Sequence, residues 1–117
     1  MRLGPLLGLA PFLLLTSSCC ATPLSAAVND LEAGQSPRAL ARLRAIGPSF
    51  EELSPDERVR YALYRGLAHL ALGDASSADS WLCQARAATT RNPDLLSLED
   101  RSRLRTALRA LGRMPGE

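Results

Sequence analysis

The placement of proline and glycine along the chain limits its fold more than any other feature. A side-chain oxygen followed directly by proline is a common start of an α-helix, and the chain has three such pairs: Ser36-Pro37, Ser54-Pro55 and Asn92-Pro93. Gly34 and Gly73 stand where helices would end, because glycine readily takes the left-handed conformation that terminates a helix. The sequence therefore predicts short helices joined by tight turns.

Between these breaks, apolar residues recur at intervals of three and four residues, which is the period of an amphipathic helix. The stretches 54–57 and 97–100 each place an acid three residues after a serine, the spacing of a capping box. The last helix could begin at Pro93 or at Leu98, and the second stretch favours Leu98. We therefore expect an all-α fold with helices at 23–33, 37–46, 55–72, 75–89 and 98–112.

The first four predicted helices form two hairpins with related sequences. Aligning Gly34 with Gly73 gives an offset of 39 residues (34 to 73), and similar residues then fall at equivalent positions. The aligned pairs include Leu31 with Leu70, Ala39 with Ala78, and Leu43 with Leu82. The two hairpins are therefore interpreted as copies of one repeat.

The second copy resembles the tetratricopeptide repeat. That family places small residues where two helices pack closely, and the equivalent residues of this chain would be Gly34, Ala39, Leu43, Gly66, Gly73, Ala78, Leu82 and Ala85, the leucines being the large residues between them. The offset is about five residues longer than the 34-residue period of the family, and the surplus fits in the loop 47–53. His69 departs from the tyrosine common in the family. The resemblance implies a short right-handed solenoid.

Stacked hairpins leave an apolar face uncovered at the end of the stack. Leu104, Ala107, Leu108 and Leu111 would give the last helix an apolar stripe that covers this face. The expected organisation is a signal segment (1–18), a tether (19–22), a first hairpin and loop (23–53), a second hairpin (54–92), a capping helix (93–113) and a tail (114–117).

The N-terminal segment has the build of an export signal, with Arg2, an apolar run from Leu3 to Leu15, and then small residues. The run is shorter than the roughly 20 apolar residues that a spanning helix needs. With Ser17-Ser18 before Cys19, it resembles the bacterial lipoprotein signal, which implies lipidation of Cys19 and, since no aspartate follows, anchoring to the outer membrane facing the periplasm. Ordinary secretion, which would give a soluble periplasmic protein, is the alternative.

Composition argues against several classes of ligand. The chain is 46% hydrophobic with a formal net charge of +2, so it can sustain a core. Its 14 basic residues, all arginine, nearly balance its 12 acids, which gives no reason to expect nucleic acid as a partner. No small-molecule substrate or cofactor is predicted either.

The sequence contains no recognisable catalytic or metal-binding pattern. Its one histidine and three cysteines have no zinc-ligand spacing, so no metal site is predicted. No nucleophile with a base and no phosphate-binding loop is recognisable, and we expect the protein not to be an enzyme. Cys83 is interpreted as a small buried hydrophobe, with pairing to Cys20 as the alternative.

Six residues are candidates for contact with a partner: Tyr61, Tyr64, His69, Trp81, Arg101 and Arg105. Each has a plainer interpretation, since aromatic residues often pack in a core and an arginine row is often a solvated helix face. The function expected from these features is a membrane-tethered scaffold or assembly factor that binds a protein or peptide in the bacterial envelope. The alternative is a permanent accessory subunit of a larger envelope complex.

Overall fold

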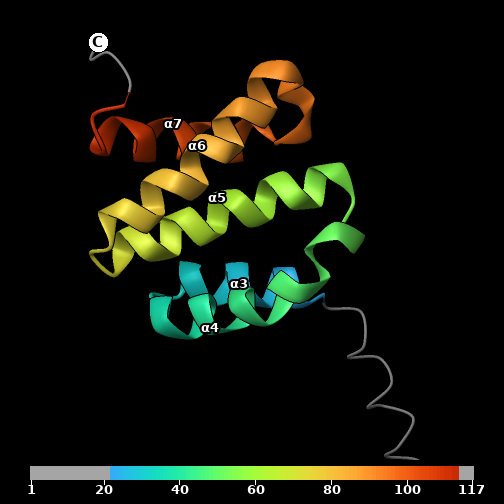
Figure 1. Cartoon of the computed structure of the whole chain (residues 1–117). Coiled ribbons are helices and arrows are strands. Elements are labelled where there is room, and N and C mark those ends of the chain that lie inside the picture. The colour runs from blue at the N-terminus through green and yellow to red at the C-terminus, as the bar shows by residue number, and fades with distance from the viewer. Residues whose placement is uncertain (1–21, 114–117) are drawn as a thin grey trace, which may run out of the picture.

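The computed structural model describes residues 22–113, which are all-helical as predicted and contain no strand. Within these residues, five α-helices and two short 3-10 helices follow one another, in the order that Figure 1 shows. Their bounds are α3 Pro23–Glu32, α4 Ser36–Ile46, η2 Gly47–Glu52, α5 Pro55–Ala71, α6 Ala75–Arg91, η3 Pro93–Leu95 and α7 Leu98–Ala110. The last α-helix begins at Leu98, as favoured from the sequence, and Asn92-Pro93 begins only η3.

The starts of α5 and α7 show how local side chains fix helix boundaries. At α5, the Ser54 side chain accepts a hydrogen bond from the Glu57 N–H, and the Glu57 carboxylate accepts one from the Ser54 N–H at 3.0 Å, which completes a capping box. At α7, the Ser97 hydroxyl accepts from the Asp100 N–H at 3.1 Å. The Asp100 carboxylate does not complete this second box but accepts a hydrogen bond from Tyr64.

The predicted N-cap at Ser36 is wrong. The structure places Gln35 at this position, without a side-chain cap, and Ser36 is already helical. The Gln35 N–H donates to the Asp30 carbonyl at 2.8 Å, and its own carbonyl accepts from Ala39 at 2.9 Å. Because Gln35 both closes α3 and opens α4, the turn leaves no separate residue for a serine cap.

Gly34 and Gly73 end α3 and α5 in the left-handed conformation, with φ of 80° and 83°. In the second turn the Asp74 N–H donates back to the His69 carbonyl at 2.9 Å. A third turn of this kind, which was not predicted, follows α7 at Gly112, with φ of 72°. The three glycines are 39 residues apart (34 to 73, 73 to 112).

The helices pack as two antiparallel pairs followed by α7. In Figure 1, α3 and α4 lie on one side of α5, and α6 and α7 lie on the other. Helix α5 contacts all four other α-helices, and α7 contacts both α5 and α6. Helix α5 is therefore central to the packing.

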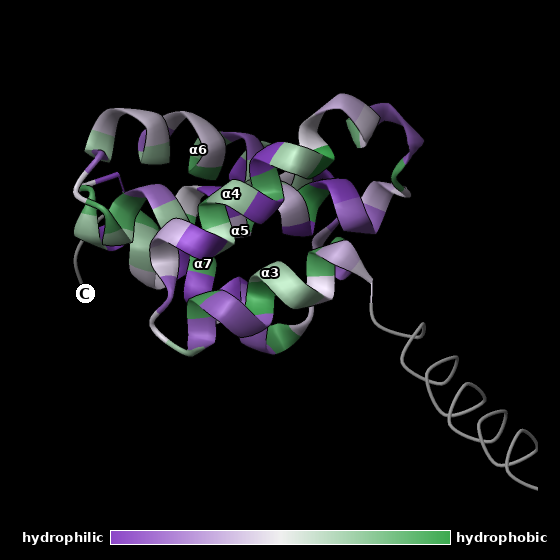
Figure 2. Cartoon of the chain, turned by 90° about the horizontal axis from the view of Figure 1, so that it is seen from below, coloured by the Kyte–Doolittle hydropathy of each residue, from purple (hydrophilic) through white to green (hydrophobic). Residues whose placement is uncertain are grey.

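One hydrophobic core runs through the helices from α3 to α7. The ribbon in Figure 2 alternates between hydrophobic and hydrophilic stretches along the helices, as amphipathic helices require. The capping stripe is part of this core, since Leu104, Ala107 and Leu108 are buried and Leu111 is half-buried. Phe50 of η2 also packs against it, so the segment expected to be a plain loop contributes to the core.

Helices α5 and α6 lie very close together at Gly66 of α5. A Cβ atom added there would stand 2.6 Å from Leu82 Cγ of α6. Ala39, Leu43, Ala78, Leu82 and Ala85, the other non-turn residues in the expected repeat-packing set, are fully buried. The absence of a Cβ at Gly66 therefore allows α5 and α6 to lie this close together.

Candidate protein-binding groove

A hollow of about 490 Å³ lies between α3, α5 and the start of α7. We call it the α3–α5–α7 groove. Its charged lining comes from all three helices and from η3, and consists of Glu32, Asp56, Arg60, Asp94, Glu99, Asp100 and Arg103. Five carboxylates against two guanidiniums make this groove acidic, although the whole chain carries a formal charge of +2.

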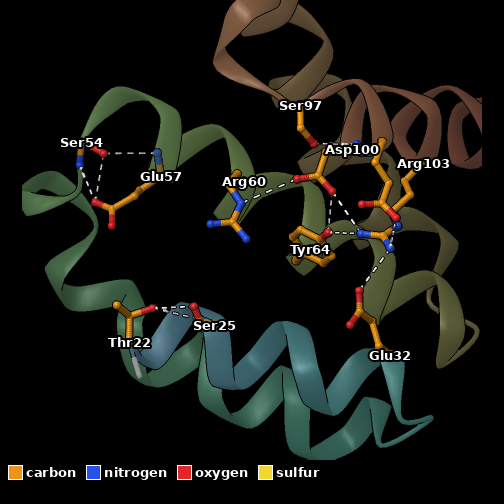
Figure 3. A network of polar contacts seen from close by, with 11 residues as sticks. Thr22, Ser25, Glu32, Ser54, Glu57, Arg60, Tyr64, Ser97, Asp100 and Arg103 are labelled. Carbon is orange, nitrogen blue, oxygen red and sulfur yellow. Dashed lines mark hydrogen bonds and ion pairs between the residues drawn. The ribbon is translucent and has the colours of Figure 1, made fainter. Parts of the chain in front are cut away.

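Tyr64 lies in the wall of the groove on α5. Tyr64 is 2% exposed, and its hydroxyl donates to Asp100 Oδ1 at 2.5 Å (Figure 3). Burial raises the pKa of Tyr64 to about 12, and the neighbouring Asp100 carboxylate adds to this shift because it repels a phenolate. The phenol therefore remains a hydrogen-bond donor at neutral pH.

Asp100 is a buried carboxylate, 6% exposed, at the start of α7. Besides the Tyr64 hydroxyl, it accepts a hydrogen bond from Arg103 Nη1 at 3.1 Å. Arg60 Nε of α5 lies 3.6 Å from its other oxygen. A buried carboxylate is costly unless it is paired and hydrogen-bonded, and these three partners meet that requirement.

Arg103 connects the first and last helices of the groove. Its Nη2 donates to Glu32 Oε2 of α3 at 3.1 Å and to Glu99 Oε2 at 3.2 Å, while its Nη1 donates to the Tyr64 hydroxyl (Figure 3). Glu32 and Arg103 are far apart in the sequence and meet across the groove. The side chains of the wall are thus held in position by contacts within the chain.

Tyr61, the other tyrosine on α5, does not share the environment of Tyr64. It is 1% exposed, donates to the Leu43 carbonyl at 2.9 Å and accepts from Arg65 at 2.8 Å. Its ring packs edge-on against Phe50 and Trp81, with centroids 5.4 and 5.5 Å away. Tyr61 is a core residue between α4 and α6 and does not line the groove.

Trp81 and His69 also lie away from the α3–α5–α7 groove. Trp81 is half-buried, and the Arg65 guanidinium lies 4.8 Å from its ring centroid. His69 is buried near the end of α5, with Nδ1 3.5 Å from Asp74 Oδ2. Burial lowers the pKa of His69 below its ordinary value, against the pull of Asp74 in the other direction.

Arg101 and Arg105 lie on a different side of α7 from Asp100 and Arg103. They line a hollow that α7 shares with α6. Of the six candidate contact residues, only Tyr64 lines the α3–α5–α7 groove. The candidates therefore do not form one site.

Most of the network around Tyr64 was not predicted from the sequence. The position of Asp100 three residues after Ser97 predicted a capping role for it, but not a contact with Tyr64. The local sequence around Arg103 indicates only an i, i+4 pair with Glu99, which the structure contains. The sequence gives no indication that Arg103 reaches Glu32, since nothing local relates residues on different helices.

Three further findings concern metals, membranes and cysteine. Within residues 22–113, no three histidine, cysteine or acidic side chains gather in a way that could hold a metal ion. No helix in this part of the chain has the length and apolarity needed to span a bilayer. Cys83 is half-buried, not buried as expected, with Sγ 3.6 Å from Asp79 Oδ1. Cys19 and Cys20 lie outside the described residues.

Comparison of the chain with protein-family models, with curated proteins and with solved structures finds no match.

Proposed function

We propose that this protein is a non-catalytic helical-repeat scaffold of the bacterial envelope, which binds a segment of a partner protein in the α3–α5–α7 groove. The observation that carries the proposal is the preformed groove, whose lining side chains sit on three helices of one core. The proposed arrangement is a short right-handed solenoid like that of tetratricopeptide repeats. The order of helix contacts, with α7 packed on both α5 and α6, supports it.

Preorganisation is the first argument for a binding role. Tyr64, Asp100 and Arg103 fix one another by hydrogen bonds, and Glu32 ties this network to α3. A partner that docks on side chains already held in place loses less conformational entropy on binding. Such a wall suits recognition of an extended segment.

The charge of the groove indicates the chemistry of that segment. Asp56 and Asp94 are exposed carboxylates at the lining, and Glu32 and Glu99 are half or more exposed. Complementary potential speeds association and excludes partners of like charge. The groove therefore favours a segment that carries arginine or lysine.

The surface bears on the alternative of a permanent accessory subunit. Such a subunit would expose a contiguous apolar patch of several hundred Å² when alone. Among residues 22–113, the large hydrophobic residues that are exposed are Leu72 at 44% and Leu98 at 76%, which stand on different elements. This surface favours a binder that exists alone between encounters.

Photocrosslinking in intact envelopes tests the proposal. A photoreactive residue at Asp56 or Asp94 should capture a discrete partner, which mass spectrometry then identifies. The matched control carries the photoreactive residue in place of Ser80, which is exposed on α6 and does not line the groove. Equal capture from Ser80, or none from the groove positions, would contradict the proposal.

The proposed tether has a separate readout in the same material. Lipidation of Cys19 predicts a mature N-terminus at Cys19 with the mass of the attached acyl chains, and a Cys19→Ser variant that leaves the membrane fraction. A mature protein that is cleaved at another position and has an unmodified N-terminus would support the soluble periplasmic alternative. That result would not affect the groove proposal.

A further inference from the structure

A second hollow, of about 170 Å³, lies between α6 and α7. Its charged lining consists of Arg86 from α6 with Arg101 and Arg105 from α7, and within residues 22–113 no aspartate or glutamate lines it. We call it the arginine cleft. Three like charges around so small a volume repel one another unless an anion lies between them.

None of the three arginines of this cleft forms an ion pair with a carboxylate of residues 22–113, although Arg86 has a longer-range electrostatic interaction with Asp79. Arg101 and Arg105 form no ion pair with any residue of 22–113. Arg86 donates from Nη1 to the main-chain carbonyl of Arg113 at 3.2 Å. In this respect they differ from Arg103, whose guanidinium pairs with Glu32, Glu99 and Asp100.

Arg101 also has a buried donor without a partner. Its Nε is buried and has no hydrogen-bond acceptor among the described residues. Arg58 and Arg65 have a buried Nε in the same state, but each guanidinium lies over an aromatic ring, Phe50 at 5.8 Å and Trp81 at 4.8 Å. No ring in residues 22–113 offers Arg101 this compensation, and an unsatisfied buried donor is costly.

We infer that the arginine cleft binds the carboxylate side chains of an acidic segment in a partner protein. A guanidinium matches a carboxylate in bidentate geometry, and such charge-assisted pairs are among the strongest hydrogen bonds in proteins. The Thr89 and Thr90 hydroxyls at the cleft already donate to main-chain carbonyls, so the arginines supply the donors. This site does not depend on the groove being a binding site.

The cleft has no exposed large apolar side chain among its described lining residues, which favours a peptide side chain over a membrane surface as its ligand. Leu104 and Leu108 form part of its lining and are 5% and 1% exposed. A peripheral membrane site combines basic residues with apolar side chains that enter the bilayer. The exposed large hydrophobic residues in 22–113, Leu72 and Leu98, do not line the cleft.

Calorimetric titration with a short glutamate peptide, and with its glutamine counterpart, tests the inference. The glutamate peptide should bind and the glutamine peptide should not, and Arg101→Gln or Arg105→Gln should weaken binding by about tenfold, as expected for loss of one charge-assisted contact. Arg44→Gln is the matched control, because Arg44 is exposed on α4 and the substitution removes the same charge. Backbone NMR signals of 89–90 and 101–108 should shift on binding.

Three results would overturn the inference. Absence of glutamate-peptide binding is the first, and equal weakening by Arg44→Gln, which would reveal nonspecific attraction, is the second. The third is Arg101-dependent binding to phosphatidylglycerol vesicles without peptide binding, which would assign the cleft to lipid. Circular dichroism checks that each variant folds, and if Arg101→Gln does not, the exposed Arg105 carries the test.

Discussion

Tyr64 and Tyr61 show how much the environment of a residue depends on its side of a helix. They are three residues apart on α5 and equally buried, yet Tyr61 donates to a main-chain carbonyl and Tyr64 donates to a carboxylate. A phenol beside a buried carboxylate strongly resists ionisation. Burial is the largest cause of the raised pKa of Tyr64, and the hydrogen bond to the Asp100 carboxylate adds to it.

The raised pKa of Tyr64 predicts loss of stability at high pH. An unfolded tyrosine ionises near pH ~10, whereas the pKa of folded Tyr64 is about 12. Between these values the unfolded chain binds fewer protons, so stability falls as pH rises through this window. The contribution is fully present below pH ~10, and its loss amounts to about 2–3 kcal/mol for a shift of this size.

Chemical denaturation at a series of alkaline pH values measures this effect, with Tyr64→Phe as the reference that cannot ionise. The absorbance difference between the two proteins isolates the titration of Tyr64, since the only other tyrosine is Tyr61. Ionisation of Tyr64 near pH ~10 in the folded protein would contradict the environment described.

At the scale of elements, the contact between α5 and α6 depends on Gly66. Alanine is a better helix former than glycine by about 1 kcal/mol, so Gly66→Ala would stabilise an isolated helix. Here the added Cβ would lie 2.6 Å from both Cγ and Cδ2 of Leu82, which is itself fully buried. The clash must therefore separate the helices or move Leu82.

We expect Gly66→Ala to lower the free energy of unfolding by about 1–3 kcal/mol, as overpacking of a core does. The measurement is denaturant unfolding of Gly66→Ala, Leu82→Ala and the double variant. Because Leu82→Ala removes the clashing atoms, the double variant should lose less than the two single losses combined. Strict additivity would show that the two residues do not press on each other.

Helix boundaries were largely predictable because caps and glycine turns are local. Ser54 with Glu57 and the turn at Gly73 are set by residues within a few positions of one another. The cap at Gln35 was missed, since it depends on how α3 ends as well as on how α4 begins. The links from Arg103 to Tyr64 and Glu32 were not predictable, because they exist only once three helices have packed.

At the scale of the whole molecule, one continuous core predicts that α7 unfolds together with the hairpins. Leu108→Ala in α7 should lower the free energy of unfolding by about 2–5 kcal/mol, because Leu108 is 1% exposed. Trp81, the single tryptophan, reports on α6, and circular dichroism reports on all helices. Both probes should show one transition, shifted equally. A Trp81 transition unaffected by Leu108→Ala would mean that α7 is an independent unit.

The two proposed sites give the molecule opposite charges on two sides of α7. The α3–α5–α7 groove is acidic, and the arginine cleft carries guanidiniums without carboxylates. Helix α7 contributes Asp100 and Arg103 to one and Arg101 and Arg105 to the other. A protein built this way could hold two partners of unlike charge on one helix.

The turns at Gly34, Gly73 and Gly112 share one backbone geometry at equal spacing (34 to 73, 73 to 112). Each follows a helix that lines the acidic groove. The chain thus makes the same glycine turn after α3, α5 and α7. Inserting another helical hairpin at such a turn would extend the wall of the acidic groove by one helix and would reuse the existing kind of connection.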